Sequence, residues 1–377
     1  MDFKPLKKFV YGLNILLAII ICSCSSGTQR TTETGVDLAP DAKLLRLSDR
    51  DGYTVAEFFS PADSVTPKLT YLLVPDSIKD VPSTGGIVIR TPIKSALIYS
   101  SVTAGALDEL GSFDVIKGVT DAQYFTDPRI KSRIASGQIV DAGAAATPSR
   151  EKLLALSPDC IILNLYEGMD VTGIDGLGIP VIKMVDNQEN TPLGRAEWIK
   201  LIGALTGKQT KAESIYSTVK SEYTALSQAT AKLNNRPKVL TENMYQGIWY
   251  VPGGNSFQAR LIKDAGGNYF KSDDKSSGSL SLSYEQVFAD ARDADVWLLK
   301  LFGVEASREE LLKMDNRYVH FDALDKKNVF YVNTEETPLF NFSVYHPEKV
   351  LAEYAAIFKA VAENKEPQGL KYYRRMK

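Results

Sequence analysis

Two histidines and three cysteines are the residues of this chain most often used in catalysis or metal binding. His320 and His346 each lack a second His or a Cys at metal-ligand spacing, so we expect both to be surface or packing residues. Cys160 lies in an apolar run and is expected to be a small buried thiol. The sequence contains neither a G-x-S-x-G nucleophile elbow nor a phosphate-binding Walker loop. It therefore predicts no catalytic site, no metal centre and no resident cofactor, and this lowers the expectation of an enzyme.

Aromatic side chains are more informative because they gather after predicted strands. One follows the strand at 115–119, three follow the strand at 238–242 and two follow the strand at 329–332: Tyr124; Tyr245, Trp249 and Tyr250; Phe340 and Phe342. Loops at the carboxyl ends of parallel strands are where α/β folds bind ligands, and aromatic rings offer broad apolar faces to a large planar or chelated ligand. We predict that these residues line a ligand site. The alternative is that most of them cover the cores of their own domains.

Glu151 and Glu285 occupy matching positions, each two residues after a serine that is a predicted helix N-cap. A carboxylate in the first turn of a helix is favoured by the helix dipole whatever its function. Helix capping is therefore one explanation of this pair, and a shared functional role is the other.

The elements that must position these residues alternate between short apolar strands and helices from Ala96 onward, which predicts parallel sheets covered by helices. Before the mid-chain helix we predict strands at 96–99, 115–119, 160–165 and 181–185, with helices at 102–110, 149–156 and near 171–176. After it we predict strands at 238–242, 296–300 and 329–332, with helices at 256–265, 283–291, 307–313 and 347–361. Residues 43–95 are β-rich, with predicted strands at 43–47, 53–59, 69–74 and 86–90.

A long helix is predicted over Lys208–Leu233, which contains neither Gly nor Pro and carries apolar residues at three- and four-residue steps. At 1.5 Å per residue it would be about 39 Å long. Residues 149–162 can be aligned with residues 283–296 without a gap, so the chain halves on either side of this helix resemble each other. The expected fold is therefore two Rossmann-like α/β lobes joined by one backbone helix, with a ligand cleft between them. An ordinary amphipathic helix packed on a single domain is the alternative.

The first 24 residues read as a targeting segment, with lysines followed by an apolar run too short to span a bilayer comfortably. Ile21-Cys22-Ser23-Cys24 then fits a lipobox, which predicts that Cys24 becomes the acylated N-terminus. A plain secretory signal or a membrane anchor is the alternative. Residues 25–42 are predicted to be a flexible tether.

Length and charge limit the remaining possibilities. At 377 residues, with 44% hydrophobic and 24% charged residues, the chain has room for two medium domains. We place the β-rich extension at 43–95, the N-terminal lobe at 96–206, the connecting helix at 207–236 and the C-terminal lobe at 237–377. A formal net charge of −2 gives no basic footprint for nucleic acid.

Four stretches, together with the order of elements, give the segment from about Ala96 to Val361 a family resemblance. They are Glu151-Lys152-Leu153-Leu154-Ala155-Leu156-Ser157-Pro158-Asp159, Gly178-Ile179-Pro180-Val181, Leu193-Gly194-Arg195-Ala196-Glu197-Trp198-Ile199 and Trp249-Tyr250-Val251-Pro252-Gly253-Gly254-Asn255-Ser256-Phe257. The segment resembles the helical-backbone class of substrate-binding proteins of ABC importers for iron–siderophores, haem and cobalamin. With its lipobox and extension, the chain is similar to the long lipoprotein members found in Bacteroidetes.

This resemblance implies a rigid helix between two lobes and one glutamate on each lobe that pairs with an arginine of the permease dimer. Those positions fall on Glu151 and Glu285. The residues Asn333–Phe342 depart from the family pattern of a Gly-rich segment and a Trp-Glu pair, so ligand identity does not transfer, and siderophore, haem and cobalamin all stay open. The resemblance implies a monomeric, lipid-anchored, periplasm-facing binding protein. An exported chelatase-like enzyme on a similar scaffold is the alternative.

Overall fold

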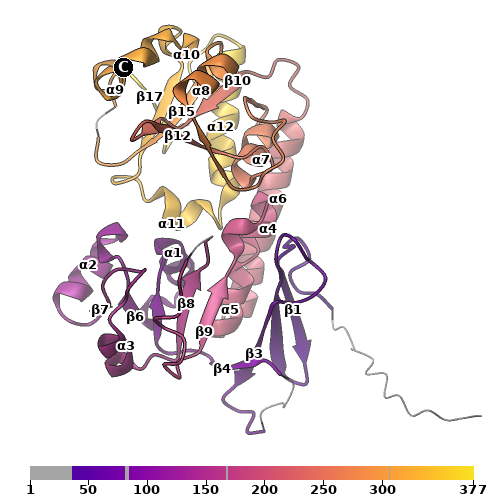
Figure 1. Ribbon diagram of the computed structural model, residues 1–377. Helices are drawn as coiled ribbons and strands as arrows, with labels where there is room; N and C mark the ends of the chain where they lie inside the picture. Colours follow the sequence, from indigo (N-terminus) through magenta and orange to yellow (C-terminus); the bar gives the residue numbers. More distant parts are fainter. Residues whose placement is uncertain (1–35, 81–84, 167–168, 305) are drawn as a thin grey trace, which may run out of the picture. The chain divides into compact units, whose positions relative to one another are not determined.

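The computed structural model describes residues 36–80, 85–166, 169–304 and 306–377 (Figure 1). The predicted signal peptide, with Cys24, lies outside these residues. The chain from Gly35 to Lys377 forms one compact unit. Within the described residues, no helix is both long enough and apolar enough to cross a membrane.

The N-terminal extension forms a four-stranded sheet of its own, in the order β1-β2-β3-β4. The strands are β1 (Leu45–Arg50), β2 (Tyr53–Phe58), β3 (Leu69–Pro75) and β4 (Ile87–Thr91). The first three are antiparallel, and β4 runs parallel to β3. Asp51 and Gly52 both have positive φ, of 49° and 87°, which suits the two-residue hairpin between β1 and β2. The β-rich character predicted for this region is confirmed.

Two buried carboxylates hold the start of the extension against the N-terminal lobe. Glu197 accepts hydrogen bonds from the backbone N–H groups of Asp41 and Ala42 at 2.7 and 2.8 Å. Glu189 accepts from the N–H groups of Lys43 and Leu44 at 3.2 and 2.8 Å. The extension and the N-terminal lobe also share one hydrophobic core. Ordered structure therefore begins before residue 43, inside the segment predicted to be a flexible tether.

The N-terminal lobe contains a five-stranded parallel sheet in the order β7-β6-β5-β8-β9. Its strands are β5 (Ala96–Ile98), β6 (Ile116–Val119), β7 (Val140–Asp141), β8 (Cys160–Asn164) and β9 (Val181–Met184). Its helices are α1 (Ser101–Glu109), α2 (Pro128–Ala135), α3 (Arg150–Leu156), α4 (Pro192–Ala196) and α5 (Ile199–Thr206). The predicted helix near 171–176 is wrong, because the backbone of 172–176 forms turns there.

The long helix α6 (Gln209–Thr230) joins the lobes, as predicted. It packs against α5 of the N-terminal lobe and α12 (Pro347–Ala362) of the C-terminal lobe. Tyr216 and Val219 belong to the core of the N-terminal lobe, and Tyr223, one helical turn further on, belongs to a core of the C-terminal lobe. Because one helix contributes buried side chains to both lobes, relative motion of the lobes must deform α6 or break one of these contacts.

The C-terminal lobe contains the sheet β13-β10-β15-β16-β17 and a separate antiparallel sheet β11-β12-β14. The first comprises β10 (Lys238–Thr241), β13 (Asn268–Tyr269), β15 (Val296–Leu301) and β16 (Val329–Asn333), all parallel, and β17 (Arg374–Arg375), which is antiparallel. The second comprises β11 (Met244–Tyr245), β12 (Ile248–Pro252) and β14 (Ser279–Leu282). The helices, besides α12, are α7 (Phe257–Asp264), α8 (Tyr284–Ala291), α9 (Arg308–Met314), α10 (Asp322–Asp325) and α11 (Leu339–Ser343).

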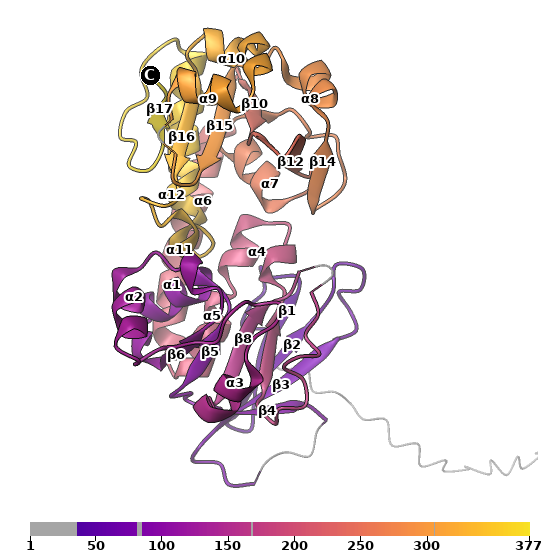
Figure 2. The ribbon, with the colours of Figure 1, turned by 60° about the vertical axis from the view of Figure 1, so that its left-hand side comes forward.

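The lobes also meet where α11 packs on α1. A Cβ atom added to Gly105 of α1 would overlap the backbone of Asn341 in α11, so the close approach requires glycine there. Beside this contact, His346 lies between two carboxylates, 2.7 Å from Glu109 of α1 and 2.7 Å from Glu348 of α12. Figures 1 and 2 both show α11 between the two lobes.

We expect His346 to make the stability of the junction depend on pH. Burial opposes its charge, but Glu109 and Glu348 outweigh burial and raise the pKa of His346 to about 9; Lys349 and Lys211 are the other charged groups near Glu109. A pKa above the unfolded value of about 6.5 stabilises the protein below that pH, and this contribution disappears as the pH rises through 9.

The contribution amounts to at most about 3 kcal/mol of unfolding free energy. Chemical denaturation at a series of pH values measures it. His346→Gln should remove the loss of stability between pH 6.5 and 9, whereas His320→Gln, at an exposed position, should leave it unchanged. An unaltered pH profile in the His346 variant would contradict this expectation.

Candidate functional site

The loops that follow the parallel strands of the two lobes meet at the lobe junction. α11 follows β16 of the C-terminal lobe and packs on α1 of the N-terminal lobe. Asn187, which follows β9, shares a pocket with residues that follow β10. The carboxyl ends of strands from both lobes therefore face a common region, the usual ligand position in parallel α/β folds.

The exposed aromatic side chains of the described residues all lie in segments that follow strands of the two lobes. They are Tyr124, Tyr166, Tyr245, Tyr250, Phe302 and Phe340. Tyr124 and Tyr166 follow β6 and β8 in the N-terminal lobe, and Phe302 and Phe340 follow β15 and β16 in the C-terminal lobe. Elsewhere in the described residues, aromatic rings are buried or half-buried. Exposing these six rings costs hydrophobic free energy that a ligand could recover by covering them.

A pocket of about 440 Å³ lies at this junction, large enough to receive part of a metal chelate. Its lining includes the aromatic residues Tyr245, Tyr250 and Phe257. Amide and hydroxyl side chains complete most of the wall: Asn187, Asn243, Gln258, Ser256, Ser277 and Ser279. Glu242 is its one charged lining residue among the described residues. The pocket can therefore offer ring faces and neutral hydrogen-bonding groups.

One residue that was predicted to face the ligand, Trp249, lies in the core of the C-terminal lobe. Trp249 is 0% exposed and packs against Trp297, Tyr318 and Phe321 at centroid distances of 5.5–5.8 Å. Its indole N–H donates to the carbonyl oxygen of Thr241 at 3.0 Å. The prediction that Trp249 faces the ligand is wrong, because it lies in strand β12, where successive side chains point to opposite faces.

Tyr250 is on the opposite face of that strand and is 43% exposed. Gln246 and Gly247, both with positive φ, form the turn between β11 and β12 and pair Tyr245 with Ile248 on the exposed face. The structure thus places Tyr245 and Tyr250 in the lining of the pocket, and their contact with a ligand stays a prediction.

The other predicted aromatic residues lie outside this pocket. Tyr124 is 64% exposed, in the loop after β6. Phe340 is 47% exposed at the start of α11, and Phe342 is half-buried against Tyr372 at a centroid distance of 4.7 Å. Sequence reasoning missed Tyr166 and Phe302, although both satisfy the same rule of an aromatic residue placed directly after an apolar strand.

Two sets of ion pairs contact residues that line the pocket or adjoin them. Glu242 has a φ of 61°, a costly backbone conformation for a non-glycine residue, and its carboxylate contacts Lys300 of β15. In the N-terminal lobe, the buried Asp186 accepts from Asn164 at 2.6 Å and pairs with Arg195 at 3.2 Å. The Arg195 guanidinium also lies over the ring of Phe257 of the C-terminal lobe, 4.5 Å from its centroid. These contacts hold pocket residues from both lobes in place.

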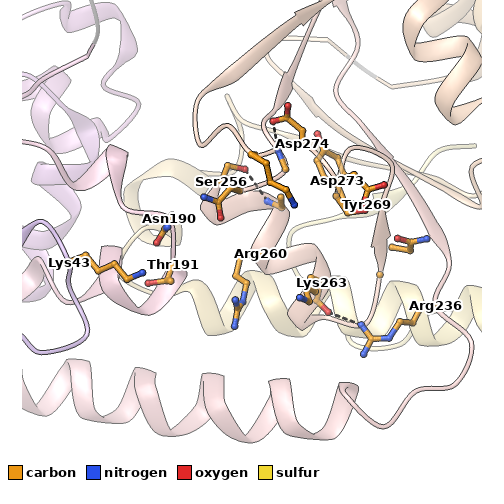
Figure 3. A pocket seen from close by; sticks show the side chains of 17 residues that line it. Lys43, Asn190, Thr191, Arg236, Ser256, Arg260, Lys263, Tyr269, Asp273 and Asp274 are labelled. Carbon is orange, nitrogen blue, oxygen red and sulfur yellow. Dashed lines mark hydrogen bonds between the residues drawn. The ribbon is translucent and has the colours of Figure 1, made fainter. Parts of the chain in front are cut away.

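A second and larger cavity, of about 590 Å³, lies at the α7 N-terminus and shares Ser256 with this pocket (Figure 3). Its lining includes five basic residues, Lys43, Arg236, Arg260, Lys263 and Lys275, and two acidic ones, Asp273 and Asp274. Arg260 pairs with Asp264 at 3.1 Å, and Arg236 donates to the carbonyl oxygen of Lys263 at 3.3 Å. No exposed aromatic of the described residues lines this cavity, so we place the ligand site in the smaller pocket despite the difference in volume.

Glu151 and Glu285 lie at equivalent positions in the two lobes. Each is the second residue of a helix, α3 or α8, and the N-cap serine side chains accept from Lys152 N and Gln286 N respectively. Both glutamates are exposed, and Glu285 lies 3.6 Å from Arg317. Hydrogen bonds from the backbone N–H of Glu285 and from Ser283 lower the pKa of Glu285. Their docking role stays a prediction.

In the described residues, no group of three or more His, Cys, Asp or Glu side chains is arranged to hold a metal ion. His320 is exposed and His346 is held at the lobe junction. Cys160 is fully buried in β8, and burial raises the pKa of its thiol above the usual range.

Comparison with known proteins adds relatives and fold neighbours. Two uncharacterized lipoproteins of Methanocaldococcus jannaschii are similar. One is 28% identical over 284 residues, which cover 69% of this chain and 67% of that protein. The other is 28% identical over 327 residues, which cover 82% of this chain and 80% of that protein.

Two solved structures share the fold. A periplasmic haem-binding protein from Pseudomonas aeruginosa matches with a TM-score of 0.57 at 19% identity, covering 74% of this chain and 97% of that one. An ABC-type Fe³⁺-hydroxamate transport protein from Saccharomonospora viridis matches with a TM-score of 0.53 at 17% identity, covering 71% of this chain and 93% of that one. The periplasmic binding protein family itself matches residues 97–335, more than half of the chain. This chain belongs to the periplasmic binding protein family, in its helical-backbone class.

Proposed function

We propose that this protein captures a metal chelate between its two lobes and delivers it to the permease dimer of an ABC importer. The observation that carries the proposal is the gathering of all exposed aromatic rings of the described residues after strands of both lobes. Large chelates present broad apolar faces, and ring stacking is the interaction such faces make best. A site divided between two lobes can contact a ligand from both sides.

The class of ligand is supported by what similar proteins are reported to bind. One fold neighbour is described as haem-binding and another as belonging to an Fe³⁺-hydroxamate transport system. Both ligands are iron complexes with extended organic surfaces. An iron–siderophore is the ligand we propose, with haem and cobalamin as alternatives within the same class.

Membrane attachment through a lipid on Cys24 is the second part of the proposal. It rests on the sequence Ile21-Cys22-Ser23-Cys24, and two relatives are described as lipoproteins. We propose a monomer that faces the periplasm from the cell envelope. A binding protein held beside its permease needs to move only a short distance to deliver the ligand.

Removing two tyrosine rings tests the site. Tyr245→Ala and Tyr250→Ala should each weaken binding of the transported chelate by about 1–3 kcal/mol, because each removes a ring face from the pocket. Isothermal titration with ferric trihydroxamate, haem and cyanocobalamin measures the affinity. Val65→Ala, which truncates an 80% exposed residue of the extension, is the control and should change nothing. Equal affinity in wild type and in both tyrosine variants would refute this location of the site.

A further inference from the structure

The charges around the proposed ligand site are markedly one-sided. The loops that follow β5, β6, β8, β9, β10, β15 and β16 contain no Lys, Arg or His in their described residues (99–100, 120–127, 165–166, 169–171, 185–191, 242–247, 302–304, 306–307 and 334–338). The loop after β13 (270–278), which reaches the pocket through Ser277 and Gly278, is balanced in charge, with Lys271 and Lys275 beside Asp273 and Asp274. The described residues of the loops without a base include eight acidic side chains: Asp121, Asp127, Asp170, Asp186, Glu189, Glu242, Glu335 and Glu336. Over the whole chain, by contrast, 44 basic residues nearly balance 46 acidic ones. The asymmetry is therefore local to the site.

Bases on neighbouring elements neutralise only part of this negative charge. Arg129 pairs with Asp127 at 2.7 Å, Arg195 with Asp186 at 3.2 Å and Arg374 with Glu336 at 3.5 Å. Lys300 is held by Glu242. Each of these four bases is thus already paired with an acid of the loops and is not left over to neutralise an anionic ligand.

Four of the eight acids form no ion pair among the described residues: Asp121, Asp170, Glu189 and Glu335. Glu189 is held by the extension, and Asp121 and Glu335 lie beside neighbouring loops of the site. The backbone N–H of Thr120 donates to the carbonyl oxygen of Ile98 in β5 at 3.3 Å, so the adjacent Asp121 lies beside the loop after β5. Burial of the Tyr99 ring, together with the charge of Asp121, raises the pKa of Tyr99 to about 12. The carboxylate of Glu335 lies 3.1 Å from the point that a Cβ on Gly303 would occupy, so it reaches the loop that carries Phe302. The unneutralised charge at the site is therefore negative and comes from both lobes.

We propose that the ligand site selects electrically neutral or cationic metal complexes and discriminates against anionic ones. This inference rests on the proposed function and narrows its ligand class. Three hydroxamates carry three negative charges and balance Fe³⁺, whereas three catecholates leave the complex trianionic, and haem carries two propionates. An anionic complex would enter a pocket that no base lines, beside loops whose free charges are negative, and such a mismatch is an effective means of rejection.

The cavity in Figure 3 shows that the chain does not lack bases near the junction. Its lysines and arginines line a space that adjoins the pocket at Ser256, but none of them lines the pocket itself. If an anionic chelate bound in this cavity, Lys263→Gln would weaken its binding and Tyr250→Ala would leave its affinity unchanged. That pattern would overturn the inference.

A ligand series that varies only in charge provides the test. The probe is a ferric linear trihydroxamate with a pendant amine, which is cationic when free, neutral when acetylated and anionic when succinylated. Titrated into the full-length protein in detergent at low ionic strength, affinity should fall about tenfold from the neutral to the anionic form, and should not fall from the neutral to the cationic form. The difference in affinity between the neutral and the anionic probe should shrink at about 1 M salt, where the Debye length is about 3 Å.

Two double substitutions, at opposite ends of the same two strands, provide the control. Asp121→Asn with Glu335→Gln, after the carboxyl ends of β6 and β16, should raise affinity for the anionic probe several-fold and leave the neutral probe unchanged. Asp114→Asn with Asp325→Asn removes the same number of charges before the amino ends of the same two strands, at side chains that are 86% and 68% exposed. This second pair should change the affinity for neither probe. Equal responses to the two double substitutions would overturn the role of these carboxylates.

The remaining outcomes separate the inference from the proposed function. Binding of neutral cyanocobalamin alone would support the inference with a different chelate. Tight binding of haem, of a ferric tris-catecholate or of the succinylated probe, at least equal to that of the neutral complexes, would overturn the inference and leave the proposed function standing. Binding of none of these complexes would refute both.

Discussion

The double substitution Glu151→Ala, Glu285→Ala should abolish growth on the transported chelate while leaving its affinity for the protein unchanged. The two carboxylates begin equivalent helices in the two lobes and both are exposed. Helix α6, packed against both lobes, would keep them at a fixed separation. Such a pair can match two arginines on a two-fold permease and so provide register as well as attraction. Each single substitution should cause a partial loss.

Glu309 offers a closely matched control for the docking glutamates. Like them, it is the second residue of a serine-capped helix, and its side chain is 78% exposed. Glu309→Ala should cost the same small amount of helix stabilisation, about 0.3–1 kcal/mol, without affecting uptake. Uptake of radiolabelled chelate by cells measures delivery, and titration of the purified variants with the chelate measures affinity. Normal uptake by the double variant would show that Glu151 and Glu285 only stabilise their helices.

Substitution of Trp249 should produce the second largest effect, on stability rather than on binding. The indole is fully buried among three aromatic rings, so Trp249→Ala leaves a large cavity and should lower the unfolding free energy by about 3–5 kcal/mol. Its neighbour Tyr250 lies on the other face of β12, and Tyr250→Ala should change the unfolding free energy by less than about 1 kcal/mol. Denaturant unfolding should therefore show a large loss of stability for Trp249→Ala and a small one for Tyr250→Ala. Chelate titration should show the loss of affinity in Tyr250→Ala instead. A loss of affinity without loss of stability in Trp249→Ala would contradict the burial.

Much of the fold could be predicted because hydrophobic periodicity is strong over the buried strands and the long helix. The predicted helix at 208–233 and the observed α6 (Gln209–Thr230) differ only at their ends, where helix boundaries are least determined by pattern. The antiparallel sheet β11-β12-β14 was missed, because its turn uses Gln246-Gly247 rather than a common turn pair and β11 has only two residues. This omission placed Trp249 in a loop and made it look available to a ligand.

The docking of the extension could not be predicted, because it depends on contacts between residues far apart in sequence. No sequence pattern marks Glu189 and Glu197 as buried, yet both are buried and receive backbone N–H groups from residues 41–44. In the site, the rule that aromatics follow strands located Tyr245 and Tyr250, and would also have found Tyr166 and Phe302 had it been applied to every strand. The pairing of Arg195, Lys300 and Arg374 with acids of the site required the folded structure.

The position of the metal in the loaded protein tests the central claim most directly. Anomalous scattering from crystals grown with a neutral ferric trihydroxamate or with cyanocobalamin locates the iron or cobalt without reference to the rest of the ligand. We predict a single metal peak at the lobe junction, with the chelate against Tyr245 and Tyr250. A peak in the basic cavity of Figure 3, or at the surface away from the junction, would contradict the account.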